Sequence, residues 1–295
     1  MELVNRCVTL VNDFYNYLIR ENPRNPWHNF KSMKKKQKTL IWQFYTEGSS
    51  KSNYLLGTMH VTDNQAFTFE EEMKKRILDC VFFATEFNLD DADLNVAQAA
   101  MLLPKGLTLS KILPKKLYEK ADIFLKKRLS ADISNYAYFK PIIFSKLITE
   151  SILSDDRLLP LDDVLFQFAK ENGRILRGVE TFDEQINILN AMPIEGQIKS
   201  LKDMMAGFPK VRRELLKTAE WYADADLEHL YKAARGSMKG SRKLMIFDRN
   251  LLMSNRLADI SAENTVCAAI GAGHLWGEKG VLNCLRKKGF IVEPT

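Results

Sequence analysis

The sequence predicts an α/β protein in which two βαβ units build a central sheet and a large helical insertion separates them. Two observations predict this class. Short apolar runs bounded by turn residues lie near both ends of the chain, within 40–85 and 265–293, which is typical of buried strands. Between them, residues from about 90 to 260 repeat apolar side chains mostly at helical spacing.

The first unit begins as a hairpin. Residues 40–45 and 54–56 are apolar, and the Gly- and Ser-rich run 48–52 between them is typical of a turn. A predicted helix over 70–78 and a buried strand over 80–85 complete a strand, helix and strand series.

The predicted insertion is mainly helical. Its apolar spacing predicts helices over 115–129, 142–153 and 162–169. One strand, 174–179, interrupts it before helices resume from 184 to about 257.

The second unit closes the chain. It comprises a strand over 265–270, a helix over 281–288 and a last strand over 290–293. We therefore expect one α/β domain over 39–295, preceded by a helical lead-in over 1–38 whose basic end is a solvated loop.

Composition excludes several classes of protein. The chain has 295 residues, with 46% hydrophobic and 27% charged, which is the balance of a globular protein and not of a disordered one. It contains no run of 18 apolar residues, so no transmembrane segment is expected. The net charge of +6 is too mild to predict a nucleic-acid partner. The four cysteines are scattered without a C-x-x-C motif and are expected to be buried thiols. The N-terminus lacks the pattern of a signal peptide, so a cytoplasmic location is expected.

One motif occurs twice. A G-x-x-H turn follows the strand that contains Gly57, ending at His60, and another runs from Gly271 to His274. The chain has only four histidines, so two such turns indicate more than coincidence. We expect each glycine to supply a positive φ for a sharp turn at the carboxyl edge of the sheet, where ligands bind in α/β proteins.

Glu86 follows the buried strand 80–85 and is expected on the same edge, close to His60. His60, Glu86 and His274 would then form a three-ligand divalent-metal site with open positions for water, which suits hydrolysis. Glu86 could instead act as a general base without binding metal. The residues themselves leave these two roles open.

Further polar residues are candidates for the same site. Arg249 and Asn250 lie on a predicted helix about 100° apart, so they could flank one cleft, with Arg249 binding a carboxylate or a developing oxyanion. Asp162, Glu180 and Gln185 form a second polar set that could support it. His28 and His229 are expected at the surface. No G-x-S-x-G, H-E-x-x-H or phosphate-binding loop occurs, which removes the usual support for a serine hydrolase, a zincin or an NTPase.

These motifs, together with Gly280-Val281-Leu282 and Lys288-Gly289-Phe290, resemble the TraB/GumN family over about residues 40–294. That family includes the Tiki metalloproteases and is related in fold to erythromycin esterase and ChaN. The resemblance implies a metal-dependent hydrolase of peptidase type, with Mn, Co or Zn as the ion. It implies catalytic roles for five residues: His60, Glu86, Arg249, Asn250 and His274. Asp162 is similar to an Asp at a helix start in the family.

Three functional hypotheses stay open from the sequence. The first is a divalent-metal hydrolase that acts on a peptide or another carbonyl-containing substrate. The second is a metal-free hydrolase of the esterase type, in which a His deprotonates water and a Glu tunes it. The third is a protein that binds and sequesters a peptide without cleaving it. A homodimer is compatible with each hypothesis.

Overall fold

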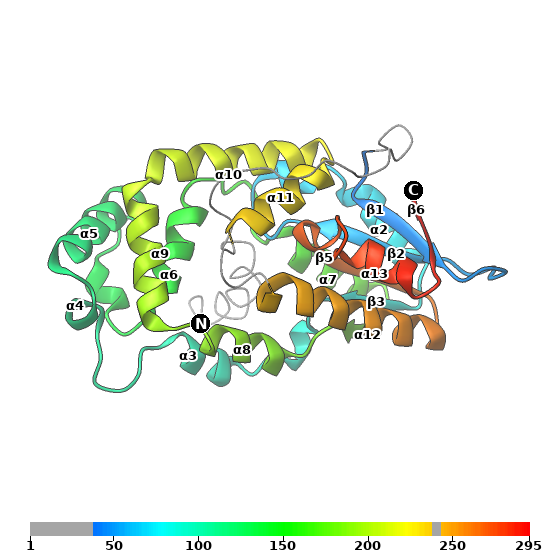
Figure 1. Ribbon diagram of the computed structural model, residues 1–295, viewed down its shortest axis with the longest axis horizontal. Helices are drawn as coiled ribbons and strands as arrows, with labels where there is room; N and C mark the ends of the chain where they lie inside the picture. The colour runs from blue at the N-terminus through cyan, green and yellow to red at the C-terminus, as the bar shows by residue number, and fades with distance from the viewer. Residues whose placement is uncertain (1–37, 238–242) are drawn as a thin grey trace.

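The computed structural model describes residues 38–237 and 243–295 (Figure 1). The predicted lead-in helix and all of its basic run except Lys38, together with Cys7 and His28, lie outside the described residues.

A six-stranded sheet forms the centre, in the order β4-β3-β5-β2-β1-β6. The four strands β4, β3, β5 and β2 are parallel, whereas β1 is antiparallel to both β2 and β6. Their bounds are β1 Ile41–Tyr45, β2 Asn53–Thr58, β3 Phe82–Thr85, β4 Ile175–Gly178, β5 Val266–Gly271 and β6 Ile291–Pro294.

The α/β class and the predicted hairpin of β1 and β2 are confirmed. The strands of each predicted βαβ unit, however, are not neighbours. Strand β5 lies between β2 and β3, with Thr58 opposite Gly271, and β6 pairs with β1. The expectation that the strand of Glu86 borders the strand of His60 is therefore wrong, since β5 separates the two.

Twelve α-helices occur among the described residues. Those around the sheet are α2 Glu70–Leu78, α7 Leu161–Glu171, α12 Arg249–Glu263 and α13 Val281–Lys287. The others are α3 Leu94–Met101, α4 Leu109–Ile112, α5 Lys115–Leu129, α6 Pro141–Glu150, α8 Phe182–Asn190, α9 Ile194–Ala206, α10 Phe208–Ala223 and α11 Leu227–Ser237. A π-helical turn, Lys243–Asp248, precedes α12, and a short 3-10 turn, Ala272–His274, follows β5.

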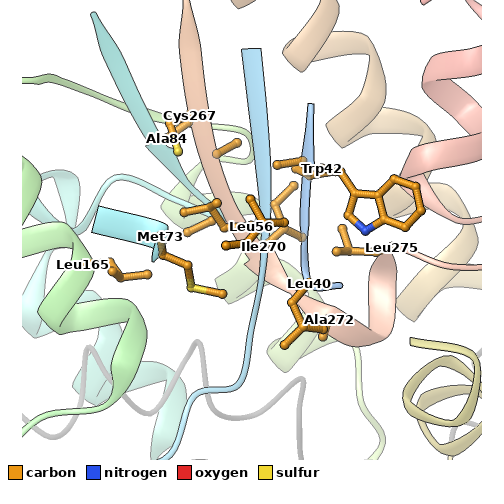
Figure 2. Close-up of a cluster of buried hydrophobic side chains, with 14 of the residues drawn as sticks. Leu40, Trp42, Leu56, Met73, Ala84, Leu165, Cys267, Ile270, Ala272 and Leu275 are labelled. Carbon is orange, nitrogen blue, oxygen red and sulfur yellow. The ribbon is translucent and has the colours of Figure 1, made fainter. Parts of the chain in front are cut away.

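The sheet is buried between two helical layers. Met73 of α2 and Leu165 of α7 lie on one face, whereas Trp42 and Leu275 lie on the other (Figure 2). Strand β5 is buried along its whole length, which explains its uninterrupted run of small and apolar residues. No described helix is long and apolar enough to cross a membrane.

The insertion forms a helical lobe beyond the carboxyl ends of the parallel strands (Figure 1). Its own hydrophobic cluster joins α4, α5, α6 and α9 through side chains such as Leu109, Leu125, Phe144 and Leu201. Helix α5 has the predicted bounds and ends at Ser130, which adopts the left-handed conformation with a φ of 50°.

Candidate active site

The parallel strands direct four candidate residues to one edge of the sheet. His60 follows β2, Glu86 follows β3, Glu180 follows β4 and His274 follows β5. This carboxyl edge is where ligands bind in open α/β sheets. The topology therefore gathers these residues although they are far apart in sequence.

The glycines of the two G-x-x-H motifs do not act as predicted. Neither Gly57 nor Gly271 has a positive φ, and Gly271 has a φ of −49°. Gly57 allows close packing instead, because a Cβ there would lie 2.9 Å from Leu275 Cδ1 and 3.3 Å from Ala272 Cβ, so that the buried Leu275 would have to shift. The absence of a side chain lets β2 approach the turn that carries His274.

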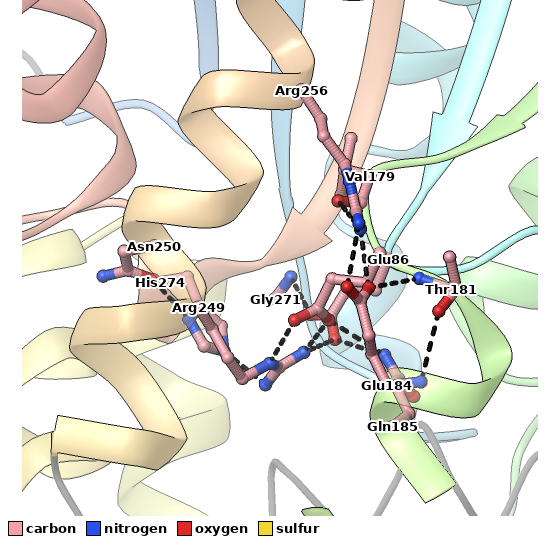
Figure 3. Close-up of polar contacts among 11 residues, drawn as sticks. Glu86, Val179, Thr181, Glu184, Gln185, Arg249, Asn250, Arg256, Gly271 and His274 are labelled. Carbon is pink, nitrogen blue, oxygen red and sulfur yellow. Dashed lines mark hydrogen bonds and ion pairs between the residues drawn. The ribbon is translucent and has the colours of Figure 1, made fainter. Parts of the chain in front are cut away.

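Arg249 lies at the centre of the largest polar network (Figure 3). Its Nη2 donates to Glu86 Oε2 at 2.7 Å and also contacts Glu180 Oε2, and its Nε donates to Glu180 Oε1 at 2.7 Å. The side chains of Arg249 and Glu180 are 3% and 1% exposed. Buried charges are stable only when paired and hydrogen-bonded, so each partner of this cluster depends on the others.

Two more donors complete the carboxylate shell. Gly271 N donates to Glu86 Oε1 at 3.0 Å, and Gln185 Nε2 donates to Glu180 Oε2 at 3.2 Å. Gln185 Nε2 also lies 3.4 Å from Glu86 Oε2. Both carboxylates are thereby fixed by donors from β5, α8 and α12.

Residues Arg249 and Asn250 hold opposite sides of one imidazole ring. Asn250 Oδ1 lies 2.6 Å from His274 Nδ1, and Arg249 Nη1 lies 3.2 Å from His274 Nε2. Asn250 Nδ2 donates to the Lys279 carbonyl at 2.7 Å, which orients Oδ1 toward the ring. We therefore assign the ring proton to Nδ1 and the lone pair to Nε2, which accepts from Arg249.

The His274 ring is neutral. Burial, reinforced by the Arg249 charge, lowers the pKa of His274 to about 3, although Glu180 opposes this shift. A neutral imidazole is what the hydrogen bond from Arg249 requires.

His60 forms a second polar group with Asp162, at the start of α7. His60 Nδ1 lies 3.2 Å from Asp162 Oδ2, and Thr58 Oγ1 donates to Asp162 Oδ1 at 2.5 Å. Burial alone would lower the pKa of His60, but Asp162, Asp163 and Glu150 outweigh it, and the pKa is raised. The two histidines of the repeated motif thus have opposite electrostatic environments.

The structure divides the predicted site residues into two groups. Arg249, Asn250, His274 and the set Glu86, Glu180 and Gln185 meet in one network, whereas His60 and Asp162 form the other. Arg249 and Asn250 both contact the His274 ring, rather than only flanking a cleft.

Two residues near His60 were not predicted. Thr58 lies inside the G-x-x-H motif, and its hydroxyl could have been recognised there as a partner for a carboxylate. Tyr222 donates from its hydroxyl to the Gly57 carbonyl at 2.9 Å, across elements distant in sequence. No sequence pattern marks that contact.

The predicted metal ligands do not fit an ion in this arrangement. Among the described residues, no three His, Cys, Asp or Glu side chains form a group that could hold a metal. Glu86 Oε2 and His274 Nε2, two of the predicted ligand atoms, both face the Arg249 guanidinium. A divalent ion at these atoms would have to displace a buried cation.

The chain belongs to the TraB/PrgY/gumN family, whose model matches residues 40–294. This match spans the sheet, both polar groups and the helical lobe, and it confirms the resemblance expected from the motifs.

Curated relatives carry the name Metalloprotease TIKI. Metalloprotease TIKI2 of Danio rerio is 23% identical and aligns over 88% of this chain and 62% of its own length. The Metalloprotease TIKI homolog of Amphimedon queenslandica is 25% identical and aligns over 87% of this chain and 61% of its own length. The chain thus spans about three-fifths of the length of these relatives. No solved structure matches the chain.

Proposed function

We propose that this protein is a hydrolase of peptides or other carbonyl-containing substrates, with its site at the carboxyl edge of the parallel strands. The observation that carries the proposal is the pairing of an imidazole with a carboxylate, His60 with Asp162, at the sheet edge that also carries Glu86, the carboxylate that binds Arg249. A base that activates water and a cation that stabilises a developing oxyanion are the groups that acyl hydrolysis requires. Family membership supports the same class.

His60 has the role of general base. Asp162 holds Nδ1 and fixes the ring, so Nε2 would take the proton of the attacking water. The raised pKa of His60 makes the neutral ring a stronger base than an ordinary histidine. Asp162, itself fixed by Thr58, orients the ring and stabilises its protonated form.

Arg249 provides the positive charge, and its neighbours position it. Glu86 and Glu180 hold the guanidinium on one side, and the neutral His274, fixed by Asn250, accepts from it on another. In this proposal His274 is a positioning residue and not a proton carrier, because a pKa of about 3 keeps it neutral across the physiological range.

A metal-dependent hydrolase is a second candidate, because the relatives are named metalloproteases. On this hypothesis a divalent ion, Mn, Co or Zn, is required for activity. The bonds of Glu86 and His274 to Arg249 favour the metal-free reaction instead.

The test is cleavage of a mixed peptide library, read by mass spectrometry, before and after exhaustive chelation. We expect cleavage that survives chelation and is lost in His60→Ala, with His229→Ala as the control because that exposed ring pairs with Asp226 and belongs to neither polar group of the site. Cleavage that chelation abolishes and one added ion restores would establish the metal-dependent candidate. Intact peptide recovered after tight binding would identify a sequestering protein and refute both.

A further inference from the structure

The helical lobe contains one strongly basic segment. Residues 105–130 contain eight basic and two acidic side chains, a difference of +6, which equals the net charge of all 295 residues. The remaining residues sum to zero, although 1–38 alone contain eight basic and three acidic side chains. Helix α5 supplies most of this charge and lies in the helical lobe, at the end of the molecule far from β1 and β6 (Figure 1).

Helix α5 has a buried face and a basic face. Leu117, Ala121 and Leu125 are buried in the lobe. At 100° per residue, Ile123 lies opposite them and is 54% exposed. An isoleucine exposed to this extent at the centre of an outer face is not part of the protein's own core.

Lysines surround this isoleucine. Lys116 lies seven residues before Ile123, Lys120 three before it and Lys127 four after it, which places all three on its face of the helix. All three lysines are exposed. Lys116 and Lys127 form no ion pair with any described residue, whereas Lys120 donates to the Met205 carbonyl at 2.6 Å. We call these four residues the α5 lysine face.

We propose that the α5 lysine face docks the protein onto an anionic lipid surface. Lysines attract the anionic headgroups, and their alkyl stems with Ile123 contact the boundary between headgroups and acyl chains. Lysines attract nucleic-acid phosphates as well, but base stacking uses aromatic rings, and this face carries the aliphatic Ile123 instead. The inference is independent of the proposed hydrolase activity.

The direct test is co-sedimentation of the full chain with vesicles. We expect binding to vesicles of equal parts phosphatidylcholine and phosphatidylserine, little binding to phosphatidylcholine alone, and weaker binding as salt is raised. Each lysine at such a surface contributes about fivefold in affinity, so the triple variant Lys116→Glu, Lys120→Glu and Lys127→Glu should bind at least about a hundredfold more weakly. Ile123→Ser should bind about tenfold more weakly.

A matched control separates the face from overall charge. The triple variant Lys51→Glu, Lys75→Glu and Lys287→Glu makes the same change in charge at exposed lysines of the sheet region. Its affinity for the vesicles should fall by less than a few-fold, and both triple variants should keep a single cooperative thermal unfolding transition. Three results would each overturn the proposal. The first is an equal loss of vesicle affinity in the two triple variants, and the second is wild-type protein that binds phosphatidylcholine vesicles as well as vesicles with phosphatidylserine. The third is protein that binds a DNA duplex but not the vesicles.

Discussion

The buried, neutral His274 should make the protein sensitive to mild acid. In an unfolded chain a histidine has a pKa of about 6.5 and gains a proton below that pH. In the folded protein the pKa of His274 is about 3, so the unfolded state binds more protons between these values. The free energy of unfolding must therefore decrease as the pH falls below about 6.5.

The magnitude follows from the two pKa values. His274 should cost about 1.4 kcal/mol of stability at about pH 5.5 and about 2.7 kcal/mol at about pH 4.5, relative to neutral pH. His60 acts in another window. Its raised pKa contributes stability that is fully present below about pH 6.5 and is lost as the pH rises through the folded value, so it does not contribute to the acid effect.

The assay is urea unfolding of the wild type and His274→Gln at several pH values between about 7 and 4.5. Glutamine can donate to Asn250 and accept from Arg249, and it does not titrate, so the variant should become less acid-sensitive than the wild type by the amounts above. His229→Gln, at an exposed site, is the matched control. A difference between wild type and His274→Gln that stays constant from neutral pH to about 4.5 would refute the assigned neutral state.

Three further predictions concern the same edge of the sheet. Arg249→Met should lower the free energy of unfolding by about 3–5 kcal/mol in urea titration, because it leaves buried carboxylates uncompensated, and adding Glu180→Gln should restore part of that loss. Gly57→Val should lower the free energy of unfolding by about 1–3 kcal/mol, since the new side chain overlaps Leu275. An unchanged urea midpoint would contradict the close-packing role. Asp162→Asn should lower the pKa of His60, seen as a shift of its NMR titration toward acid; a shift toward alkali would contradict the pairing.

Local signals in the sequence predicted the elements well. The bounds of α2 and α5 agree with the spacing of their apolar residues, and the hairpin of β1 and β2 follows from its turn-rich connection. Strand order was not predictable from such signals, because the pairing of β5 with both β2 and β3 joins segments on either side of the helical insertion. Periodicity reports which face of a strand is buried and not which strand lies beside it.

Local signals also predicted which residues lie at the candidate site, but not how they pair. A carboxylate or imidazole after each parallel strand must lie at one edge of the sheet, which placed Glu86, Glu180 and His274 there. The hydrogen-bond partner of each of these side chains depends on interatomic distances, which the sequence does not contain. Arg249 donates hydrogen bonds to Glu86, Glu180 and His274 Nε2. Two of the predicted metal ligands, Glu86 and His274, are therefore bound to a guanidinium.

The central position of β5 has a consequence for how the protein is made. This strand bridges β2 and β3, yet it leaves the ribosome only after the whole helical insertion has been synthesised. A nascent chain that stops before Val266 therefore has two strand pairs, β1 with β2 and β3 with β4, and no strand that joins them. Such late, long-range closure predicts slow maturation and a growing polypeptide that depends on protection from aggregation.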